Sequence, residues 1–102
     1  MDSLIAAHRA EIEALCRRFH VKRLEVFGSA LREDFDPERS DVDFLVELDK
    51  SASPNLFHDY MDLREALVDL LGRPVDLLMP AAIRNPYLRS RIDEQRTLLY
   101  AA

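Results

Sequence analysis

The chain has 102 residues, of which 48% are hydrophobic and 32% are charged. This is enough for one compact core and leaves no length for a second domain. The formal net charge of −5 offers no attraction to a nucleic-acid backbone or to an anionic membrane surface. There is no long apolar run and no basic secretory leader, and a single cysteine cannot form an internal disulfide. We therefore expect one domain over residues 1–102, located in the cytoplasm.

The first predicted element is an amphipathic helix from Ser3 to about Phe19. Apolar or partly apolar residues recur at steps of three and four, the spacing of one buried helix face. They are Ile5, His8, Ile12, Leu15, Cys16 and Phe19. We expect this face to pack on a sheet, with Cys16 as a small buried residue. On the surface, Glu13 and Arg17 should form an i,i+4 pair.

A strand predicted from Val21 to Phe27 leads into Gly28, one of only two glycines in the chain. A residue without a Cβ atom suits a tight turn, and Ser29 is a good N-cap for the short helix expected next. The N–H groups at a helix start attract anions, and the Ser29 hydroxyl can donate to a phosphate oxygen. The turn is therefore a candidate phosphate site.

Two aspartates open the next predicted strand, Asp41 to Leu48, after a polar loop from Phe35 to Ser40. Side chains alternate along a strand, so Asp41 and Asp43 share one side and lie roughly 7 Å apart. The other side is apolar and consists of Val42, Phe44, Val46 and Leu48. Two like charges on a mostly buried strand need compensation. Either arginine side chains or a divalent cation can supply it.

A long helix is predicted from Ser53 and Pro54, an N-cap followed by a first-turn proline, to about Leu71. Gly72 suits the position after a helix end. The expected apolar stripe, including its flanks, consists of Leu56, Phe57, Tyr60, Met61, Leu63, Leu67, Leu70 and Leu71. Core packing explains this stripe, and its exposed flank could bind a partner.

A third strand is predicted between two prolines, from Arg73 to Pro80. Asp76 is alone in this apolar run and needs a partner. If the strand lies beside the second one, Asp76 comes next to Asp41 and Asp43, and three carboxylates converge. Such a set of oxygen ligands suits Mg²⁺ or Mn²⁺.

Two short elements complete the prediction: a helix from Pro86 to Gln95, capped by Asn85, and an edge strand from Thr97 to Tyr100. The expected fold class is α/β (α+β), a small domain in which a mixed sheet of three or four strands packs against helices.

The order of these motifs resembles the Gly-Ser and Asp-x-Asp signature of the DNA polymerase beta-type nucleotidyltransferase superfamily. Gly28 and Ser29 match the first part, and eleven residues separate Ser29 from Asp41. Asp41 and Asp43 match the second part, and Asp76 matches the third carboxylate. More narrowly, nearly the whole chain resembles the minimal nucleotidyltransferases of the MntA type, which are antitoxins to HEPN-domain toxins.

The resemblance implies transfer of AMP from ATP to a hydroxyl group, with two Mg²⁺ or Mn²⁺ ions at the attacking and leaving oxygens. Asp41, Asp43 and Asp76 would hold the metal ions, and Asp76 could accept the proton of the acceptor hydroxyl. The implied acceptor is a tyrosine of a partner HEPN ribonuclease toxin, which the modification would silence.

By the same resemblance, Gly28 and Ser29 would bind the β- and γ-phosphates of ATP. Arg32 or Arg39 could pair with a phosphate, and both are equally suited to a solvated loop. No acceptor site is evident in the sequence, so we expect the partner to supply half of the active site.

Two alternatives remain open. The chain could be a binding antitoxin that masks its toxin without catalysis, because an acidic surface suits the basic face of a ribonuclease. It could also be a nucleotidyltransferase that acts on a small molecule. The lack of a second domain argues against a small-molecule acceptor, and we expect no direct binding of nucleic acid.

Overall fold

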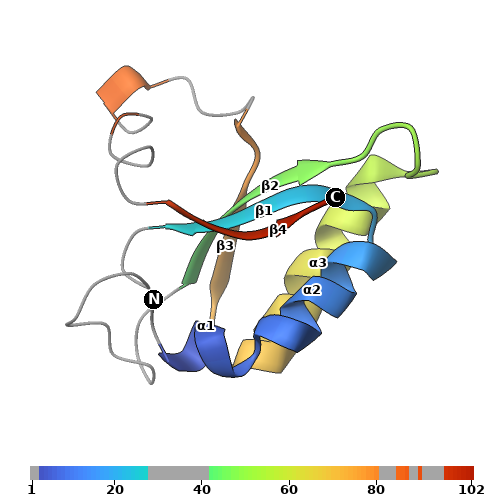
Figure 1. Cartoon of the computed structure of the whole chain (residues 1–102). Coiled ribbons are helices and arrows are strands. Elements are labelled where there is room, and N and C mark those ends of the chain that lie inside the picture. Colours follow the sequence, from blue (N-terminus) through green and yellow to red (C-terminus); the bar gives the residue numbers. More distant parts are fainter. Residues whose placement is uncertain (1–2, 28–41, 81–84, 88–89, 91–95) are drawn as a thin grey trace.

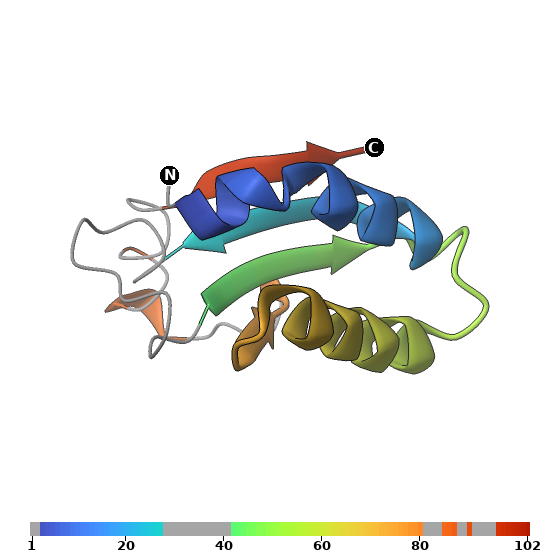
Figure 2. The same cartoon turned by 90° about the horizontal axis from the view of Figure 1, so that it is seen from below.

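In the described part of the chain, four strands form one sheet, and the three helices within residues 3–71 lie against the same face of it (Figures 1 and 2). The computed structural model describes residues 3–27, 42–80, 85–87, 90 and 96–102. The helices are α1 (Ser3–Ala7), α2 (Arg9–Arg18) and α3 (Leu56–Leu71). The strands are β1 (Val21–Phe27), β2 (Val42–Leu48), β3 (Val75–Leu78) and β4 (Thr97–Ala101). No helix in these ranges is long and apolar enough to cross a membrane.

The sheet is mixed, with the strand order β3-β2-β1-β4. β1 pairs antiparallel with both β2 and β4, whereas β2 and β3 are parallel. A parallel pair needs a crossover connection, and α3 supplies it. The predicted mixed sheet packed with helices is confirmed, as is the predicted edge position of the last strand.

The predicted N-terminal helix is divided at His8, which is the N-cap of α2 (φ −110°, ψ 14°). The carbonyl of His8 accepts the first hydrogen bond of α2, from the N–H of Ile12 at 2.9 Å. Its ring Nδ1 lies 2.9 Å from a carboxylate oxygen of Glu11. The His8 side chain is half-buried, and it combines its place on the predicted stripe with this polar contact.

A second correction concerns the charges of α2. Glu13 bonds to Arg9, one turn earlier, at 3.4 Å from Arg9 Nε, rather than to Arg17 as predicted. Both pairings have i,i+4 spacing, so sequence spacing alone could not choose between them.

One apolar core fills the space between the sheet and the helices. From the strands it contains Leu24, Val26, Val42, Phe44, Val46, Val75, Leu77 and Leu99, and from the helices Ile5, Ile12, Cys16, Leu63, Leu67 and Leu71. The alternation predicted for the second strand is confirmed. Burial, together with the nearby Glu13 carboxylate, raises the pKa of the Cys16 thiol to about 12. Cys16 is therefore a neutral packing residue at physiological pH.

α3 begins at Leu56 with Asn55 as its N-cap, whose side chain accepts a hydrogen bond from the N–H of His58 at 3.2 Å. The predicted cap, Ser53, instead donates its hydroxyl to the Asp59 carboxylate. The helix ends at Gly72, as predicted. Gly72 is left-handed (φ 66°), and its N–H donates to the carbonyl of Val68 at 2.8 Å.

Two residues assigned to the apolar stripe of α3 lie outside it. Phe57 is 70% exposed and Met61 is 41% exposed. They occur one turn apart on the outer flank, where the sheet does not reach. The prediction that they widen the core-facing stripe is wrong.

Two predicted segments fall wholly or partly beyond the described residues. The turn and loop between β1 and β2 are not described. Of the predicted helix from Pro86 to Gln95, Pro86, Tyr87 and Ser90 are helical. The N–H of Tyr87 donates to the Asn85 side chain at 2.9 Å, as expected for the predicted cap.

Candidate active site

Asp43 and Asp76 occupy paired positions on the two parallel strands β2 and β3. Neighbouring strands lie about 4.8 Å apart, so the two residues stand side by side. Both are on the face of the sheet opposite to the helices, because their strand neighbours on either side belong to the core. The sequence made this pairing conditional on β3 lying next to β2, and the structure satisfies that condition.

Contacts from α3 fix the position of β3 and hence of Asp76. The Arg64 side chain donates from Nε to the carbonyl of Val75 at 3.2 Å. The Tyr60 hydroxyl donates to the carbonyl of Leu77. At the start of the strand pair, the N–H of Val42 donates to the carbonyl of Pro74 at 3.1 Å. These bonds bracket Asp76, so a slip of one residue would break them and turn its side chain toward the core.

The two carboxylates suit a divalent cation. Asp43 is half-buried and Asp76 is exposed, and like charges at this separation repel when both are ionised. Hard cations such as Mg²⁺ prefer carboxylate oxygens, which this pair supplies. Among the described residues there is no group of three or more potential ligands. Asp41, the other predicted ligand, lies outside the described residues.

The predicted phosphate-binding residues Gly28, Ser29 and Arg32 also lie outside the described ranges. The strand that leads into them is described, however. Phe27, the last residue of β1, pairs with Asp43. β1 therefore ends beside Asp43, one residue before Gly28 in the sequence.

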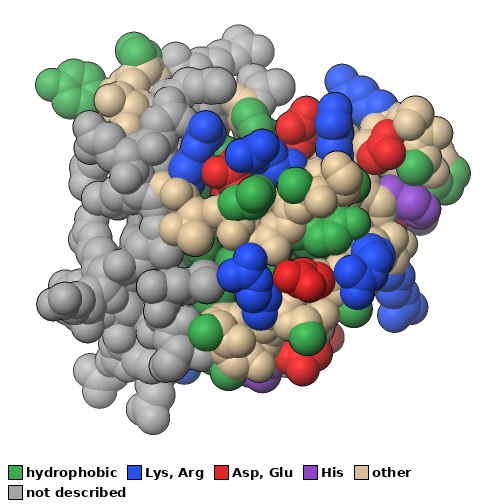
Figure 3. Space-filling model, in the orientation of Figure 1, with side chains coloured by type: hydrophobic (Ala, Val, Ile, Leu, Met, Phe, Trp, Pro, Cys, Tyr) green, Lys and Arg blue, Asp and Glu red, His purple; other side chains and the backbone are tan. Residues whose placement is uncertain are grey.

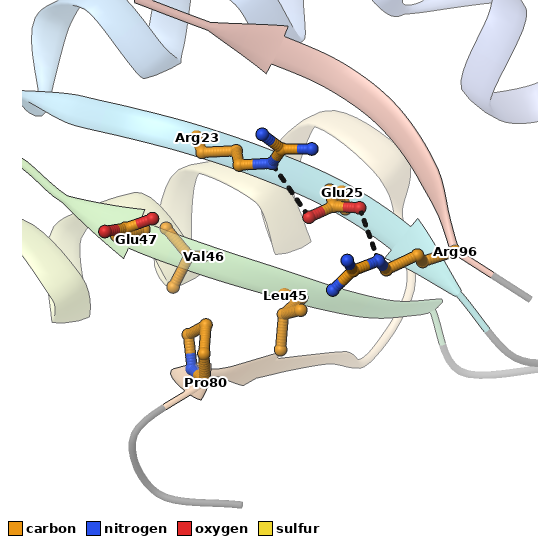
Figure 4. Close-up of a pocket in the computed structure, with 7 residues that line it drawn as sticks. All are labelled: Arg23, Glu25, Leu45, Val46, Glu47, Pro80 and Arg96. Atoms are coloured by element: carbon orange, nitrogen blue, oxygen red, sulfur yellow. Dashed lines mark hydrogen bonds and ion pairs between the residues drawn. The ribbon is translucent and has the colours of Figure 1, made fainter. Parts of the chain in front are cut away.

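A hollow of about 230 Å³ lies on this face of the sheet, opposite to α1, α2 and α3, which we call the open face (Figure 4). Its lining residues are Arg23, Glu25, Leu45, Val46, Glu47, Pro80 and Arg96. Glu25 is the one buried charged residue among the described ones, at 5% exposure. Its two carboxylate oxygens accept from Nε of Arg23 at 3.0 Å and from Nε of Arg96 at 3.2 Å.

Sequence reasoning missed this cluster. Arg23 and Glu25 are two residues apart on one strand, which is the spacing of neighbours on one face, and that signal was available. Arg96 immediately precedes β4, and the pairing of β4 with β1 brings it next to Glu25. The spacing of residues along the chain could not have revealed it.

Basic and acidic side chains are interspersed over the face seen in Figure 3. Among the described residues on that face, no broad basic patch is seen.

The sequence matches a known family over most of its length. The profile of the nucleotidyltransferase domain matches residues 9–99. The chain is 34% identical over 94 residues to protein adenylyltransferase MntA of Thermococcus cleftensis, covering 92% of this chain and 88% of that protein.

Solved structures have the same fold. A minimal nucleotidyltransferase superposes with a TM-score of 0.70 and 31% identity, and 95% of each chain is covered. The complex of a tri-AMPylated HEPN toxin with its MNT antitoxin, from Shewanella oneidensis, gives a TM-score of 0.63. That match has 20% identity and covers 95% of this chain and 72% of the other, so it shows the fold alone.

Proposed function

This chain belongs to the nucleotidyltransferase family, and from that premise we propose that it is an antitoxin that transfers AMP from ATP to a HEPN-domain toxin. The acceptor is a side-chain hydroxyl, in our proposal that of a tyrosine, and the modification silences the toxin. One observation carries the catalytic part: Asp43 and Asp76 stand at paired positions on the open face of the sheet. The similarity to a protein adenylyltransferase supports the transferred group, and the fold shared with an MNT antitoxin supports the partner.

The reaction forms a bond between the acceptor oxygen and the α-phosphorus of ATP. The bond from the α-phosphorus to the bridging oxygen breaks, pyrophosphate leaves, and the hydroxyl loses its proton. We assign Asp43 and Asp76, with Asp41 as the predicted third ligand, to two divalent cations, Mg²⁺ or Mn²⁺. When bound, such ions neutralise charge on the attacking and leaving oxygens. Asp76 is the residue to which we assign the proton of the acceptor.

The remaining predicted residues serve the nucleotide. In this proposal the backbone N–H groups of Gly28 and Ser29 and the Ser29 hydroxyl hold the β- and γ-phosphates. Arg32 adds a positive charge to the same phosphates. Together they orient the triphosphate so that its α-phosphorus faces the carboxylate pair.

The direct test is transfer of label from [α-³²P]ATP, with Mg²⁺, to the HEPN-domain protein that we propose as its partner. We expect label on the HEPN protein and loss of its ribonuclease activity. Asp43→Asn and Asp76→Asn should abolish both effects. Asp69→Asn, an exposed residue of α3, is the matched control and should leave them unchanged. No label, together with full inhibition of the ribonuclease by both site variants, would favour an antitoxin that only masks its toxin.

A further inference from the structure

We propose that the hollow on the open face is the acceptor subsite, which receives the protein segment that carries the hydroxyl group. This inference rests on the proposed function and names where the acceptor binds. It also revises the expectation that the chain has no acceptor site of its own. The occupant is an uncharged aromatic side chain bearing a hydroxyl, with the backbone on either side of it.

The in-line geometry of the transfer predicts on which side of the carboxylate pair the acceptor binds. In phosphoryl transfer the attacking and leaving oxygens lie roughly in line on opposite sides of the phosphorus. The predicted phosphate-binding pair Gly28-Ser29 follows Phe27, which pairs with Asp43. Pyrophosphate therefore leaves toward the end of β1. The acceptor must arrive from the opposite direction, along the sheet past Leu45 and Glu25, where the hollow lies.

The spacing fits an aromatic hydroxyl. Leu45 follows Asp43 by two residues on the same face, a distance of roughly 7 Å along the strand. A phenol ring that lies on Leu45 can extend over this distance and direct its oxygen toward the carboxylates. The hollow, at about 230 Å³, has room for one aromatic side chain.

The charges of the lining favour a neutral occupant. Two positive side chains, Arg23 and Arg96, are balanced by two negative ones, Glu25 and Glu47. A site for a triphosphate would carry an excess of positive charge. The apolar surface of Leu45 and Pro80 suits a ring.

Glu25 is a positioning residue in this subsite. Because it is nearly buried and accepts from Nε of both Arg23 and Arg96, it fixes the planes of the two guanidinium groups (Figure 4). A guanidinium carries five N–H donors and a flat face that stacks on aromatic rings. Arginines held in this way can contact both the ring and the backbone carbonyls of an acceptor segment.

The test uses Arg23→Gln and Arg96→Gln in the full chain, with the HEPN-domain protein as the probe. A lost charge-assisted contact should raise the KM for the HEPN protein, and its Kd without ATP, by about tenfold. The KM for ATP should stay within about twofold, since the nucleotide binds elsewhere. Arg17→Gln, an exposed residue of α2, is the control and should change none of these values. Arg23→Lys and Arg96→Lys, which keep the charge, should restore part of the affinity.

Two results would overturn the subsite. One is a raised KM for ATP with unchanged affinity for the HEPN protein, which would assign the hollow to the adenine ring. The other is no change in either value. If the unaltered protein transfers no label, the proposed function fails, but the Kd of the HEPN protein still tests the hollow. Arg23 is 47% exposed, so Arg23→Gln carries the test even if melting curves show that Arg96→Gln is unfolded.

Discussion

At the scale of single residues, Asp43 and Asp76 repel each other, which lowers the stability of the fold, and the same two carboxylates can bind a cation. Like charges directly opposite each other on neighbouring strands destabilise a sheet by about 0.2–1 kcal/mol. The two residues nevertheless occupy paired positions, on the face of the sheet opposite to α1, α2 and α3. A cation between them would turn this repulsion into attraction.

Replacing Asp76 by Asn should therefore separate activity from stability. We expect kcat/KM for AMP transfer to fall at least about 100-fold, because a metal ligand contributes several kcal/mol to the transition state. In EDTA the free energy of unfolding should stay constant or rise by about 0.5 kcal/mol, because the repulsion is removed. Labelled transfer and urea unfolding measure the two effects. Lower stability in EDTA would show that Asp76 has a stabilising partner instead.

The sequence could predict these two residues but not the cluster around Glu25. Asp76 stood out because it is a single charge in an apolar strand, and the alternation of β2 fixed the side on which Asp43 lies. The joining of Glu25 to Arg96 depends on the register of β4 against β1, which includes an irregularity between Leu24 and Glu25. Such irregularities cannot be deduced from the spacing of residue types.

At the scale of elements, the end of α3 depends on one backbone conformation. Gly72 has a φ of +66°, and a Cβ atom placed there would meet no atom within 4 Å. Gly72→Ala should therefore cost about 1–2 kcal/mol through backbone strain alone. Gly72→Asn should cost less, because Asn tolerates this region. Urea unfolding of both variants tests this, and equal costs would contradict the conformational explanation.

A second feature at this scale joins three segments through one carboxylate. Asp59 in α3 accepts from the Ser53 hydroxyl in the loop before the helix. It also bonds to the ring Nδ1 of His20, at 3.0 Å. His20 lies in the turn between α2 and β1 with a φ of 60°. The Ser53 hydrogen bond, followed by the interaction with His20, lowers the pKa of Asp59.

The lowered pKa predicts how the stability depends on pH. A carboxyl group whose pKa is lower in the folded state stabilises the fold above its unfolded value, about pH 4. That contribution is lost as the pH falls through the lower folded value. Asp59→Asn should therefore cost about 1.5 kcal/mol near pH 5.5 and less near pH 3. Asp62→Asn, exposed on the same helix, should show no such dependence in urea unfolding at the two pH values. A cost for Asp59→Asn that is undiminished near pH 3 would contradict the assignment.

The same carboxylate explains why the start of α3 was predicted incorrectly. Ser53 followed by Pro54 is a strong start signal, yet the Ser53 hydroxyl bonds to Asp59 and Asn55 provides the cap. The limits of β1 and the end of α3 were predictable, because glycine and the alternation of apolar residues act locally. Side chains with a choice of partners were not predictable, as His8 and Glu13 also show.

At the scale of the whole molecule, binding of Mg²⁺ should be visible in thermal unfolding. A ligand at ten times its Kd stabilises the folded state by about 1.4 kcal/mol. In a domain of this size that raises Tm by about 6–10 °C. Asp76→Asn should lose most of this increase. NaCl at equal ionic strength is the control, since it screens charges without binding the site. An equal increase from NaCl would mean that the carboxylate pair does not hold the ion.

Because α1, α2 and α3 lie on one face of the sheet, alternate residues of each strand are under different constraints. One set is constrained by core packing, and the other set is not. Residues that face the helices, such as Leu24 and Val46, are fixed by packing, because any change of volume is felt throughout the core. Exposed residues that alternate with them, such as Glu47, face away from α1, α2 and α3 and can change at little cost in stability. In the proposed function, such proteins could therefore acquire new acceptors by substitution of every second residue of a strand, while the fold stays the same.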